Sequence, residues 1–504
     1  MKIYTAALDG LNLTKVTVEA DISNGLPSFI IVGLGDASIK EARERIRPAL
    51  KNSGFKFPQT KKVINLAPAD IKKQGSHFDL PIAVSMLFSS GQILTDNEEP
   101  IFCAGELMLS GNLRKIPGAL PITHFAKNLG FKRIFIPYQN RKEAAMIKDI
   151  DVFPVKNIRD IIMHLEKQNF IKPYLKADII KSSESCRDEY DECIDFNQIY
   201  GQEIPKRALE IAAASHHHIL MYGPPGTGKT ILAKAFPSIL PVLNDAESME
   251  VSMIYSVAAG KHSLTLPVKK PQIRHVHHSI SSVTLLGGGN SLEIGEATLA
   301  HMGVLFLDEI AEFEKQTLEN LREPLQEGII RLGRNGKTVV LPAYFQLLAA
   351  MNPCPCGYFG DTKKNCQCSQ YQIKQYYKKI SGPILDRIDL VVEVPRLNNE
   401  NFLAASQSES SKQIRERVIA AREIQIKRGF LNSRIEMKQI KEICRPDKET
   451  ENFIRFIAEK LNLSTRSYLG ILRVSRTIAD LENSDSVKTS HIAEAVQYRK
   501  SFIY

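Results

Sequence analysis

Short apolar runs separated by polar residues mark the middle of the chain. The runs at 219–222, 304–307, 345–352 and 390–394 are four to eight residues long, and helical patterns lie between them. Runs of this kind predict strands that are buried on both faces, because both sides of such a strand must be covered. Strands that alternate with helices predict a parallel α/β sheet. Residues 196–397 are therefore expected to form an α/β domain.

The flanking blocks have different patterns. Residues 1–170 mix short alternating runs with amphipathic stretches, and they predict a strand at 61–66 and a helix at 38–51. Residues 398–504 have helical spacing throughout, strongest at 414–427 and 447–461. We expect an α+β domain before the α/β domain and a helical domain after it.

Residues 171–195 differ from both neighbours. The stretch is polar and acidic and contains few branched apolar residues. Such a composition cannot bury enough apolar surface to order itself. We expect an exposed acidic linker at this position.

Composition adds the class of protein and its environment. The chain has 504 residues, 66 Lys and Arg against 56 Asp and Glu, and a net charge of +10. This modest basic excess suits a polyanionic partner but is weak evidence alone. No apolar run approaches the length of a membrane span, and the first residues lack a signal-peptide pattern. We expect a cytoplasmic protein, whose eight cysteines are reduced or metal-bound.

The strongest motif follows the apolar run at 219–222. It fits the phosphate-binding pattern G-x-x-x-x-G-K-[ST] and consists of Gly223, Pro224, Pro225, Gly226, Thr227, Gly228, Lys229 and Thr230. A helical pattern at 230–236 follows it, so the loop lies between a strand and a helix, as phosphate binding requires. Lys229 is expected to reach the β- and γ-phosphates of ATP, and Thr230 to ligate Mg²⁺. The alternative is a glycine turn without a ligand.

Polar residues end the next two apolar runs. Asp308 and Glu309 follow 304–307, and a buried strand that ends there places both carboxylates beside the phosphates. Asp308 is expected to hold Mg²⁺ and Glu309 to activate water. Asn352 ends 345–352 and can contact the γ-phosphate or the water. A solvated acidic strand end is the alternative for Asp308 and Glu309.

Two arginines are candidates for contact with the nucleotide. Arg387 follows a helix-like stretch and precedes the apolar run at 390–394, where it could serve the γ-phosphate of a neighbouring subunit. The alternative is an ion pair with Asp386 or Asp389. Arg466 lies at the start of a helix that Ser464 opens, and it could close over bound nucleotide.

Basic residues suggest what the protein acts on. Asn335-Gly336 between two β-rich runs predicts a hairpin, with Arg334 and Lys337 at its tip and Arg331 nearby. Lys269 and Lys270 begin a second basic stretch that continues to Arg274 and three histidines. Charge at such tips suits a phosphodiester backbone. Solvated basic tips are the alternative.

Four of the cysteines lie close together in the sequence. Cys354, Cys356, Cys366 and Cys368 form C-x-C-x₉-C-x-C, which fits a tetrahedral Zn²⁺ site with a structural role. Reduced cysteines without a ligand are the alternative.

The order of these motifs resembles that of the AAA+ ATPases: Walker A, Walker B, sensor 1, arginine finger and sensor 2. More narrowly, the chain is similar to the bacterial magnesium-chelatase-like AAA+ family known as YifB or ComM. The similar segments lie before and after the linker, at 21–29, 31–34, 65–72, 78–83, 201–203, 206–213, 286–289 and 351–357. This chain has Val276 where the family has a proline, and 290–296 also lacks the usual prolines. Both departures are expected to lie in loops.

The resemblance implies an AAA+ P-loop sheet with a helical lid, preceded by a Lon-protease-like (ribosomal S5 domain 2-like) α+β domain. The serine and lysine of a Lon-type dyad fall on His77 and Leu120, and Ser76 has no evident partner, so a peptidase is not expected. The resemblance further implies a hexameric ring with Arg387 acting in trans. The hairpin would lie in the central pore.

In the ComM branch this machinery is a DNA helicase that promotes branch migration during natural transformation and homologous recombination. The resemblance therefore implies ATP and Mg²⁺ as cofactors, branched or single-stranded DNA as partner, and no membrane. The alternative is a magnesium-chelatase-type or MoxR-like chaperone that remodels a protein partner for metal insertion. An ATP-dependent protease is the third possibility and lacks the lysine it needs.

Overall fold

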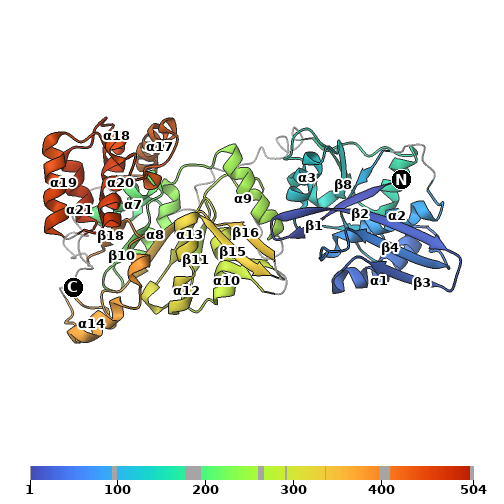
Figure 1. Ribbon diagram of the computed structural model, residues 1–504, viewed down its shortest axis with the longest axis horizontal. Coiled ribbons are helices and arrows are strands. Elements are labelled where there is room, and N and C mark those ends of the chain that lie inside the picture. The colour runs from blue at the N-terminus through green and yellow to red at the C-terminus, as the bar shows by residue number, and fades with distance from the viewer. Residues whose placement is uncertain are drawn as a thin grey trace. The chain divides into compact units, whose positions relative to one another are not determined.

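The computed structural model divides the chain into two compact units. One comprises Met1–Arg187, Ser248–Val268 and Arg334–Val339, and the other comprises Asp188–Glu247, Lys269–Gly333 and Val340–Tyr504. The structure describes residues 2–93, 99–175, 194–258, 266–289, 292–334, 337–361, 363–396, 409–461 and 463–499. Most of the expected acidic linker, residues 176–193, lies outside this described part. The elements are labelled in Figure 1.

A five-stranded sheet organises the first unit, in the order β3-β4-β2-β1-β5. Its strands are β1 (Ile3–Asp9), β2 (Asn12–Ser23), β3 (Ser28–Val32), β4 (Lys61–Ala67) and β5 (Ile101–Phe102). The pairs β1–β2 and β2–β4 are antiparallel, whereas β3–β4 and β1–β5 are parallel. The predicted strand at 61–66 is confirmed as β4.

Helices of the first unit bury their apolar sides against this sheet. Asp36 caps α1 (Ala37–Asn52) by accepting a hydrogen bond from the Ile39 amide at 2.9 Å, which satisfies one free amide of the first turn. This helix confirms the prediction at 38–51. α2 (Asp79–Ser89) is buried along most of its length and packs against β2.

The other strands and helices between residues 99 and 175 divide between two cores: some extend the core of the five-stranded sheet, and the rest form a second, smaller core around a parallel strand pair. They are β6 (Glu106–Leu107), β7 (Leu113–Arg114), α3 (Ala119–Asn128), β8 (Arg133–Pro137), α4 (Arg141–Ala144), β9 (Asp151–Val155) and α5 (Ile158–Leu165). β8 pairs with β9, and Ser256 accepts the amide hydrogen bond of Gly118 at 2.8 Å. Residues 248–268 thus belong to this unit although they follow the P-loop in the sequence.

A buried ion pair joins α1 to α2. Asp79 accepts hydrogen bonds from Arg45 Nε at 2.7 Å and from the Leu107 amide at 3.2 Å, and the Asp79 side chain is 1% exposed. Burial raises the pKa of Asp79 to about 6, although the bonds from Arg45 oppose this shift. A carboxyl in an unfolded chain has a pKa of about 3.9.

We therefore expect the stability around α2 to fall as pH rises. Between about pH 4 and pH 6 the folded chain keeps a proton on Asp79 that the unfolded chain releases, and above pH 6 this contribution is gone. From pH 5 to pH 8 the loss is about 1 kcal/mol. Hydrogen exchange of the α2 amides, corrected for the intrinsic pH dependence, measures it.

Asp79→Asn should remove this fall, whereas Asp70→Asn, at an exposed carboxylate of the same unit, should keep it. Equal pH dependence in the wild type and in Asp79→Asn would contradict the assignment.

The second unit is built on a five-stranded sheet with the order β11-β14-β17-β10-β18. Its strands are β10 (Ile219–Tyr222), β11 (Ile273–Val276), β14 (Val304–Leu307), β17 (Gln346–Met351) and β18 (Leu390–Glu393), and all neighbours are parallel. β14 and β17 are buried at every position, as the apolar runs predicted. The predicted α/β fold with a parallel sheet is confirmed.

One expectation about this sheet is wrong. Residues 274–276 were expected in a loop but lie in β11, at the edge of the sheet. Arg274 there pairs with Glu296 at 2.6 Å, and His275 contacts the ring of Phe306 at a centroid distance of 4.8 Å. The sequence did not indicate this strand because its polar side chains form no apolar run, and their partners lie on other elements.

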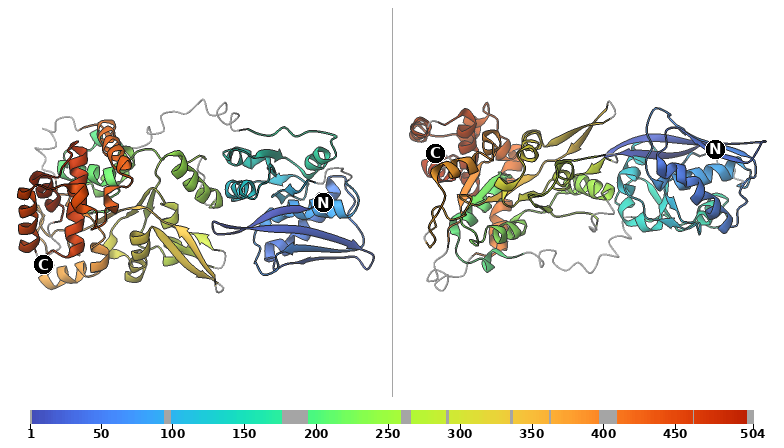
Figure 2. Two further views of the ribbon diagram at one scale, coloured as in Figure 1. Left: turned by 45° about the horizontal axis from the view of Figure 1, so that its top comes forward. Right: turned by 90° about the horizontal axis from the view of Figure 1, so that it is seen from below.

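Helices and a hairpin complete the α/β part of the unit. They include α7 (Glu203–Ser215), α8 (Lys229–Ala235), α10 (Ser282–Leu286), α11 (Glu296–Leu299), α12 (Lys315–Glu319), α13 (Arg322–Glu327), α14 (Gln370–Tyr377) and α15 (Gly382–Leu385), and α9 (Asp245–Val257) begins in this unit and continues in the first. β12 (Gly287–Gly288) pairs with β13 (Glu293–Ile294). β15 (Ile329–Arg334) and β16 (Lys337–Pro342) form the predicted two-stranded sheet, which Figure 2 shows as a hairpin.

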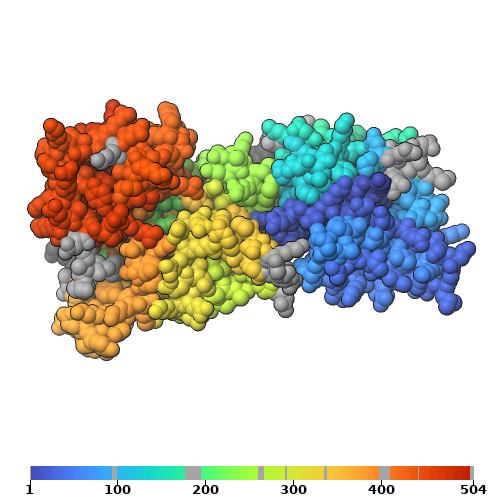
Figure 3. All heavy atoms as spheres, viewed as in Figure 1, coloured from blue at the N-terminus to red at the C-terminus, as the bar shows by residue number. Residues whose placement is uncertain are grey.

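The C-terminal block is helical, as expected. It contains α17 (Ser411–Arg428), α18 (Ile440–Cys444), α19 (Lys448–Lys460), α20 (Thr465–Leu481) and α21 (Thr489–Gln497). α17 and α19 confirm the helices at 414–427 and 447–461, and Ser464 caps α20. Figure 3 shows the surface of this block in orange and red. No helix in the described ranges is long and apolar enough to cross a membrane.

Side chains from α17 join this block to the α/β sheet. The last carbonyl groups of a helix have no partner within the helix. At the end of α7, Arg422 donates to the Ala213 carbonyl at 2.8 Å and Gln425 donates to the Ala214 carbonyl at 3.1 Å. These bonds tie the helical block to the layer that carries the P-loop.

Candidate nucleotide-binding site

Three strand ends meet at one edge of the parallel sheet. β10 lies between β17 and β18, with Tyr222 opposite Met351, and β14 lies on the other side of β17. Gly223, Asp308 and Asn352 each follow the last residue of one of these strands. The sheet therefore brings together the P-loop, the acidic pair and the asparagine that the sequence predicted.

The P-loop has the backbone that its glycines permit. Gly226 and Gly228 have φ values of +77° and +99°, in the left-handed region that favours glycine. A Cβ atom at Gly223 would lie 2.2 Å from the Val394 carbonyl oxygen, so this position accepts only glycine. The loop leads into α8, whose first residues are Lys229 and Thr230.

Lys229 lies inside this loop and is 9% exposed. Its Nζ donates to the Gly223 carbonyl at 2.6 Å and to the Pro224 carbonyl at 2.9 Å. Burial lowers the pKa of Lys229 to about 8, against the opposing charges of Asp308 and Glu309. The ammonium group is thus held by weak neutral acceptors, which a phosphate oxygen can replace.

The acidic pair lies beside the first turn of α8. Thr230 Oγ1 donates to Asp308 Oδ2 at 3.0 Å, across 78 residues of sequence. A hydroxyl and a carboxylate in contact form the oxygen pair that P-loop proteins use for Mg²⁺. Asn352 Oδ1 lies 3.4 Å from Lys229 Nζ, so the asparagine reaches the same place. Glycine loop, lysine and oxygen pair together fit a magnesium nucleotide.

Glu309 has a neighbour that the sequence analysis did not assign. Its carboxylate lies 3.7 Å from Nδ1 of His278, a residue just beyond the end of β11. The backbone of Glu309 has φ +53°. The side chain of Glu309 is 53% exposed, as a group that activates water requires. The sequence did not indicate this contact, because the contact depends on β11 lying beside β14. Only the order of the strands in the sheet shows that they are neighbours.

Arg387 lies at the amino-terminal ends of the sheet strands, whereas the P-loop of the same chain lies at their carboxyl-terminal ends. It precedes β18, whose first residue is level with the first residue of β10, whereas the P-loop follows the last residue of β10. The four residues of β18 span about 13 Å. Arg387 is therefore poorly placed to contact a nucleotide on its own P-loop.

The contacts of Arg387 do not support the alternative of an ion pair. Its guanidinium donates to the Pro383 carbonyl at 2.6 Å and to Gln326 Oε1, and Nε has no hydrogen-bond partner within the described residues. Asp389 instead pairs with His217 at 3.0 Å. Burial lowers the pKa of Arg387, and the positive charges of Arg466 and Arg322 act in the same direction.

Arg466 lies exposed in the first turn of α20. The positive charge of Arg466 helps to lower the pKa of Arg387, so the two arginines lie near enough to repel each other. The residues whose charges act on Lys229 are Asp308 and Glu309. The structure thus groups Arg466 with Arg387, and contact between Arg466 and a nucleotide stays a prediction.

The predicted DNA-contacting residues differ in their surroundings. Arg331 in β15 forms ion pairs with Glu323 and with Glu327, the latter at 2.7 Å. Lys269 and Lys270 precede β11, and the Lys269 carbonyl accepts the Leu243 amide at 2.8 Å. Residues 335–336 and the side chains of Arg334 and Lys337 lie outside the described part of the structure.

The four clustered cysteines come together in space. The sulfur atoms of Cys354, Cys356, Cys366 and Cys368 all lie within 4.8 Å of one another. Cys354 Sγ is 3.3 Å from Cys356 Sγ and 3.7 Å from Cys366 Sγ. Zn–S bonds of about 2.3 Å in a tetrahedron separate the sulfurs by about 3.8 Å. The cluster therefore has dimensions close to those of a four-thiolate zinc site.

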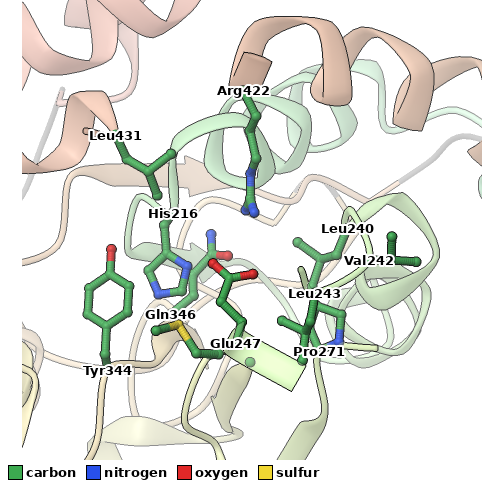
Figure 4. A pocket seen from close by; sticks show the side chains of 12 residues that line it. His216, Leu240, Val242, Leu243, Glu247, Pro271, Tyr344, Gln346, Arg422 and Leu431 are labelled. Atoms are coloured by element: carbon green, nitrogen blue, oxygen red, sulfur yellow. The ribbon is translucent and has the colours of Figure 1, made fainter. Parts of the chain in front are cut away.

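A separate polar pocket lies at the amino edge of the sheet. Figure 4 shows His216, Glu247 and Gln346 turned toward one another, with Arg422 above them. His216 Nε2, Gln346 Oε1 and the Tyr344 hydroxyl are buried there without partners among the described residues. The cavity of about 40 Å³ accommodates a few water molecules and no nucleotide.

The first unit contains no Lon-type dyad at the positions considered. His77 is buried, with Nε2 2.9 Å from the Ala6 carbonyl oxygen, and Leu120 lies in the apolar core. The expectation that Ser76 lacks a partner is wrong, because its hydroxyl donates to Glu106. That partner is a carboxylate, and no lysine is bonded to Ser76 within the described residues.

Family models match most of the chain. Residues 195–402 match the model described as magnesium chelatase, subunit ChlI. Residues 18–140 match subunit ChlI of Mg-chelatase, and residues 408–499 match the C-terminal part of subunit ChlI. The first and last of these matches cover the α/β sheet and the helical block of the second unit.

Relatives that align with nearly the whole chain show which branch of the family it belongs to. The protein YifB of Salmonella typhimurium is 40% identical over 500 residues, which cover 99% of this chain and 96% of that protein. The competence protein ComM of Haemophilus influenzae is 39% identical over 99% of this chain and 97% of its own length. A magnesium-chelatase 67 kDa subunit of Chlorobaculum tepidum is 26% identical over 32% of this chain. The chain belongs to the YifB/ComM family of magnesium-chelatase-like AAA+ proteins.

Proposed function

We propose that the protein is an ATPase that couples ATP hydrolysis to movement along DNA and promotes branch migration during DNA integration in natural transformation and recombination. The similarity to a competence protein over nearly the full length is the observation that carries this proposal. The contact of Asn352 with Lys229 and that of Asp308 with Thr230 support an ATP-hydrolysing site.

The residues of the site have distinct roles in this proposal. Lys229 and the amides of the P-loop bind the phosphates, and Thr230 and Asp308 hold Mg²⁺. Bound Mg²⁺ neutralises charge on the phosphates. Glu309 accepts a proton from the attacking water, and Asn352 positions that water and the γ-phosphate. Glu309 is exposed enough to meet water from the solvent.

A ring of subunits completes the site. Arg387 lies at the sheet edge opposite its own P-loop, so the γ-phosphate it stabilises belongs to the next subunit. Head-to-tail contacts of this kind close into rings when the rotation permits. We place Arg387 and Arg466 at this interface, and a hexamer is the expected ring.

The DNA lies, in this proposal, against the basic hairpin of β15 and β16. Arg334 and Lys337 at its tip contact the phosphodiester backbone, and Lys269 and Lys270 add a second basic stretch. Backbone contacts serve a motor that must move along any sequence.

Hydrolysis and strand displacement together test this function. We expect ATP hydrolysis to rise with a four-way DNA junction, and labelled strands to be displaced by the wild type but not by Lys229→Ala. Each reaction is compared with a linear duplex of equal length. An ATPase that no DNA stimulates and that displaces no strand would reject the DNA motor.

Arg331 is expected to contribute less to DNA binding than the two basic residues at the hairpin tip. Because Glu323 and Glu327 already neutralise Arg331, we expect Arg331→Ala to change DNA affinity less than about twofold. Replacing Arg334 and Lys337 together should weaken DNA binding about tenfold. The slope of log affinity against log salt concentration should fall by the equivalent of about two phosphate contacts. Fluorescence anisotropy over a series of salt concentrations measures both effects. Equal losses in the two variants would contradict this assignment of the hairpin.

A chaperone that remodels a protein for metal insertion is the second candidate. The partial similarity to a magnesium-chelatase subunit favours it. An ATPase with Lys229-dependent activity but no response to DNA would support this candidate.

A structural zinc ion is part of the proposal. The four sulfurs of Cys354, Cys356, Cys366 and Cys368 have the separation that tetrahedral Zn²⁺ requires. Elemental analysis of purified protein should give about one zinc per chain, and less than a tenth of that when Cys366 and Cys368 are both serine.

A further inference from the structure

The four-cysteine cluster lies directly on the nucleotide site. Asn352, which contacts Lys229, is separated from Cys354 by one residue, Pro353. Gly357, between the first and second cysteine pairs, touches the P-loop: a Cβ atom built on it would lie 3.0 Å from Pro225 Cδ. Any group that holds the cysteines in place therefore also positions Asn352 and Pro225 at the nucleotide site.

The segment that holds the cysteines has little else to order it. The described part of residues 353–369 contains no helix or strand, and loops longer than about 12–15 residues are uncommon inside compact domains. Backbone amides donate to the sulfurs, from Phe359 to Cys354 at 3.3 Å and from Cys356 to Cys368 at 3.4 Å. Such donors are typical of the surroundings of metal ligands.

Two contacts tie the first residue and the middle of the segment to neighbouring elements. Tyr377 at the end of α14 donates its hydroxyl hydrogen bond to the Pro353 carbonyl at 2.9 Å. Asp361 pairs with Arg396, beyond the end of β18, at 2.9 Å. The segment is thus a closed lobe over the P-loop, and the cysteine cluster is its centre.

We propose that Zn²⁺ bound by the four cysteines acts as a clamp on the ATP site, so that metal occupancy controls the rate of hydrolysis by positioning Pro225 and Asn352. This inference rests on the proposed ATPase function and adds its regulation. The lobe does not supply Lys229 or Thr230, so nucleotide binding survives metal loss. Misplacement of the reacting groups by about 1 Å lowers a rate up to a hundredfold.

Two glycines in the lobe test the clamp without disturbing the metal. Gly357 and Gly360 have similar left-handed φ values of +84° and +79°, so alanine strains the backbone equally at both. Only at Gly357 does the added Cβ meet another group, namely Pro225, whereas nothing lies within 4 Å at Gly360. We expect Gly357→Ala to lower kcat about tenfold more than Gly360→Ala, with zinc content unchanged in both.

Removal of the metal from the full-length wild type is the complementary test. A chelator should lower kcat at least about tenfold while the affinity for a fluorescent ATP analogue changes less than about threefold, and added Zn²⁺ should restore kcat. The Cys366→Ser and Cys368→Ser double variant should behave as the chelated protein does, and Cys103→Ala as the wild type.

The outcomes separate this inference from the proposals it rests on. Chelated protein with the kcat of the wild type, or equal kcat in the two glycine variants, would overturn the clamp. A wild type that neither contains nor takes up zinc would overturn it together with the zinc site. A wild type without ATPase activity would reject the proposed function and the clamp with it, whereas the first two outcomes leave the proposed function standing.

Discussion

Replacement of Lys229 by alanine should lower ATP hydrolysis by about a hundredfold to a thousandfold. The Lys229 ammonium group is buried within the P-loop, where it donates to the Gly223 and Pro224 carbonyls. Alanine removes the charge and leaves Asp308 without a nearby cation. The affinity for ATP should fall with the rate, measured by a coupled ATPase assay and by titration with a fluorescent ATP analogue.

Lys234→Ala is the matched control for this variant. Lys234 lies on the same helix, α8, and is exposed. Its replacement removes one positive charge from the helix without touching the loop, so rate and affinity should stay within about twofold of the wild type. Retention of wild-type hydrolysis by Lys229→Ala would contradict the assignment of the nucleotide site.

Arg387→Ala should lower kcat by about 10³-fold or more, the loss typical of an arginine finger. Binding of the nucleotide should change little, because Arg387 lies at the sheet edge opposite the P-loop of its own chain. Arg455→Ala, at an exposed arginine of α19, serves as the control and should keep full activity. Comparison of kcat with the dissociation constant of the ATP analogue separates the two effects.

Mixing of two inactive variants decides whether Arg387 acts in trans. When Lys229→Ala and Arg387→Ala subunits are mixed in equal amounts, one contact in about four joins an intact P-loop to an intact Arg387 in a head-to-tail ring. Hydrolysis should therefore return to about a quarter of the wild-type rate. Mixed rings that stay as inactive as each variant alone would show that Arg387 does not act on a neighbouring nucleotide.

Local patterns predicted the elements whose signals lie within a few residues. The strands at 219–222 and 304–307 were predicted with the bounds that β10 and β14 have, because both carry continuous apolar runs that are buried except at the partly exposed Tyr222. The glycines of the P-loop indicated their own backbone, since the left-handed φ of Gly226 and Gly228 excludes most other residues.

The predictions were wrong or incomplete where a residue depends on a partner far along the chain. β11 was missed because Arg274 is paired by Glu296, and a polar strand at a sheet edge has no apolar run. The contact of His278 with Glu309 was missed because it requires β11 beside β14. Ser76 appeared to lack a partner because Glu106 lies 30 residues away.

The order of motifs along the chain is enough to predict which chemical groups the protein has and in which order its strands carry them. The folded sheet shows at which ends of the strands each group lies: Thr230 and Asp308 meet across 78 residues, whereas Arg387 lies at the ends opposite its own P-loop. The physical reason is that a motif is set by local backbone conformation and side-chain type, but strand order is set by burial over the whole domain. Lys229 is therefore recognisable in the sequence, and its need for an arginine from elsewhere becomes apparent only in the folded sheet.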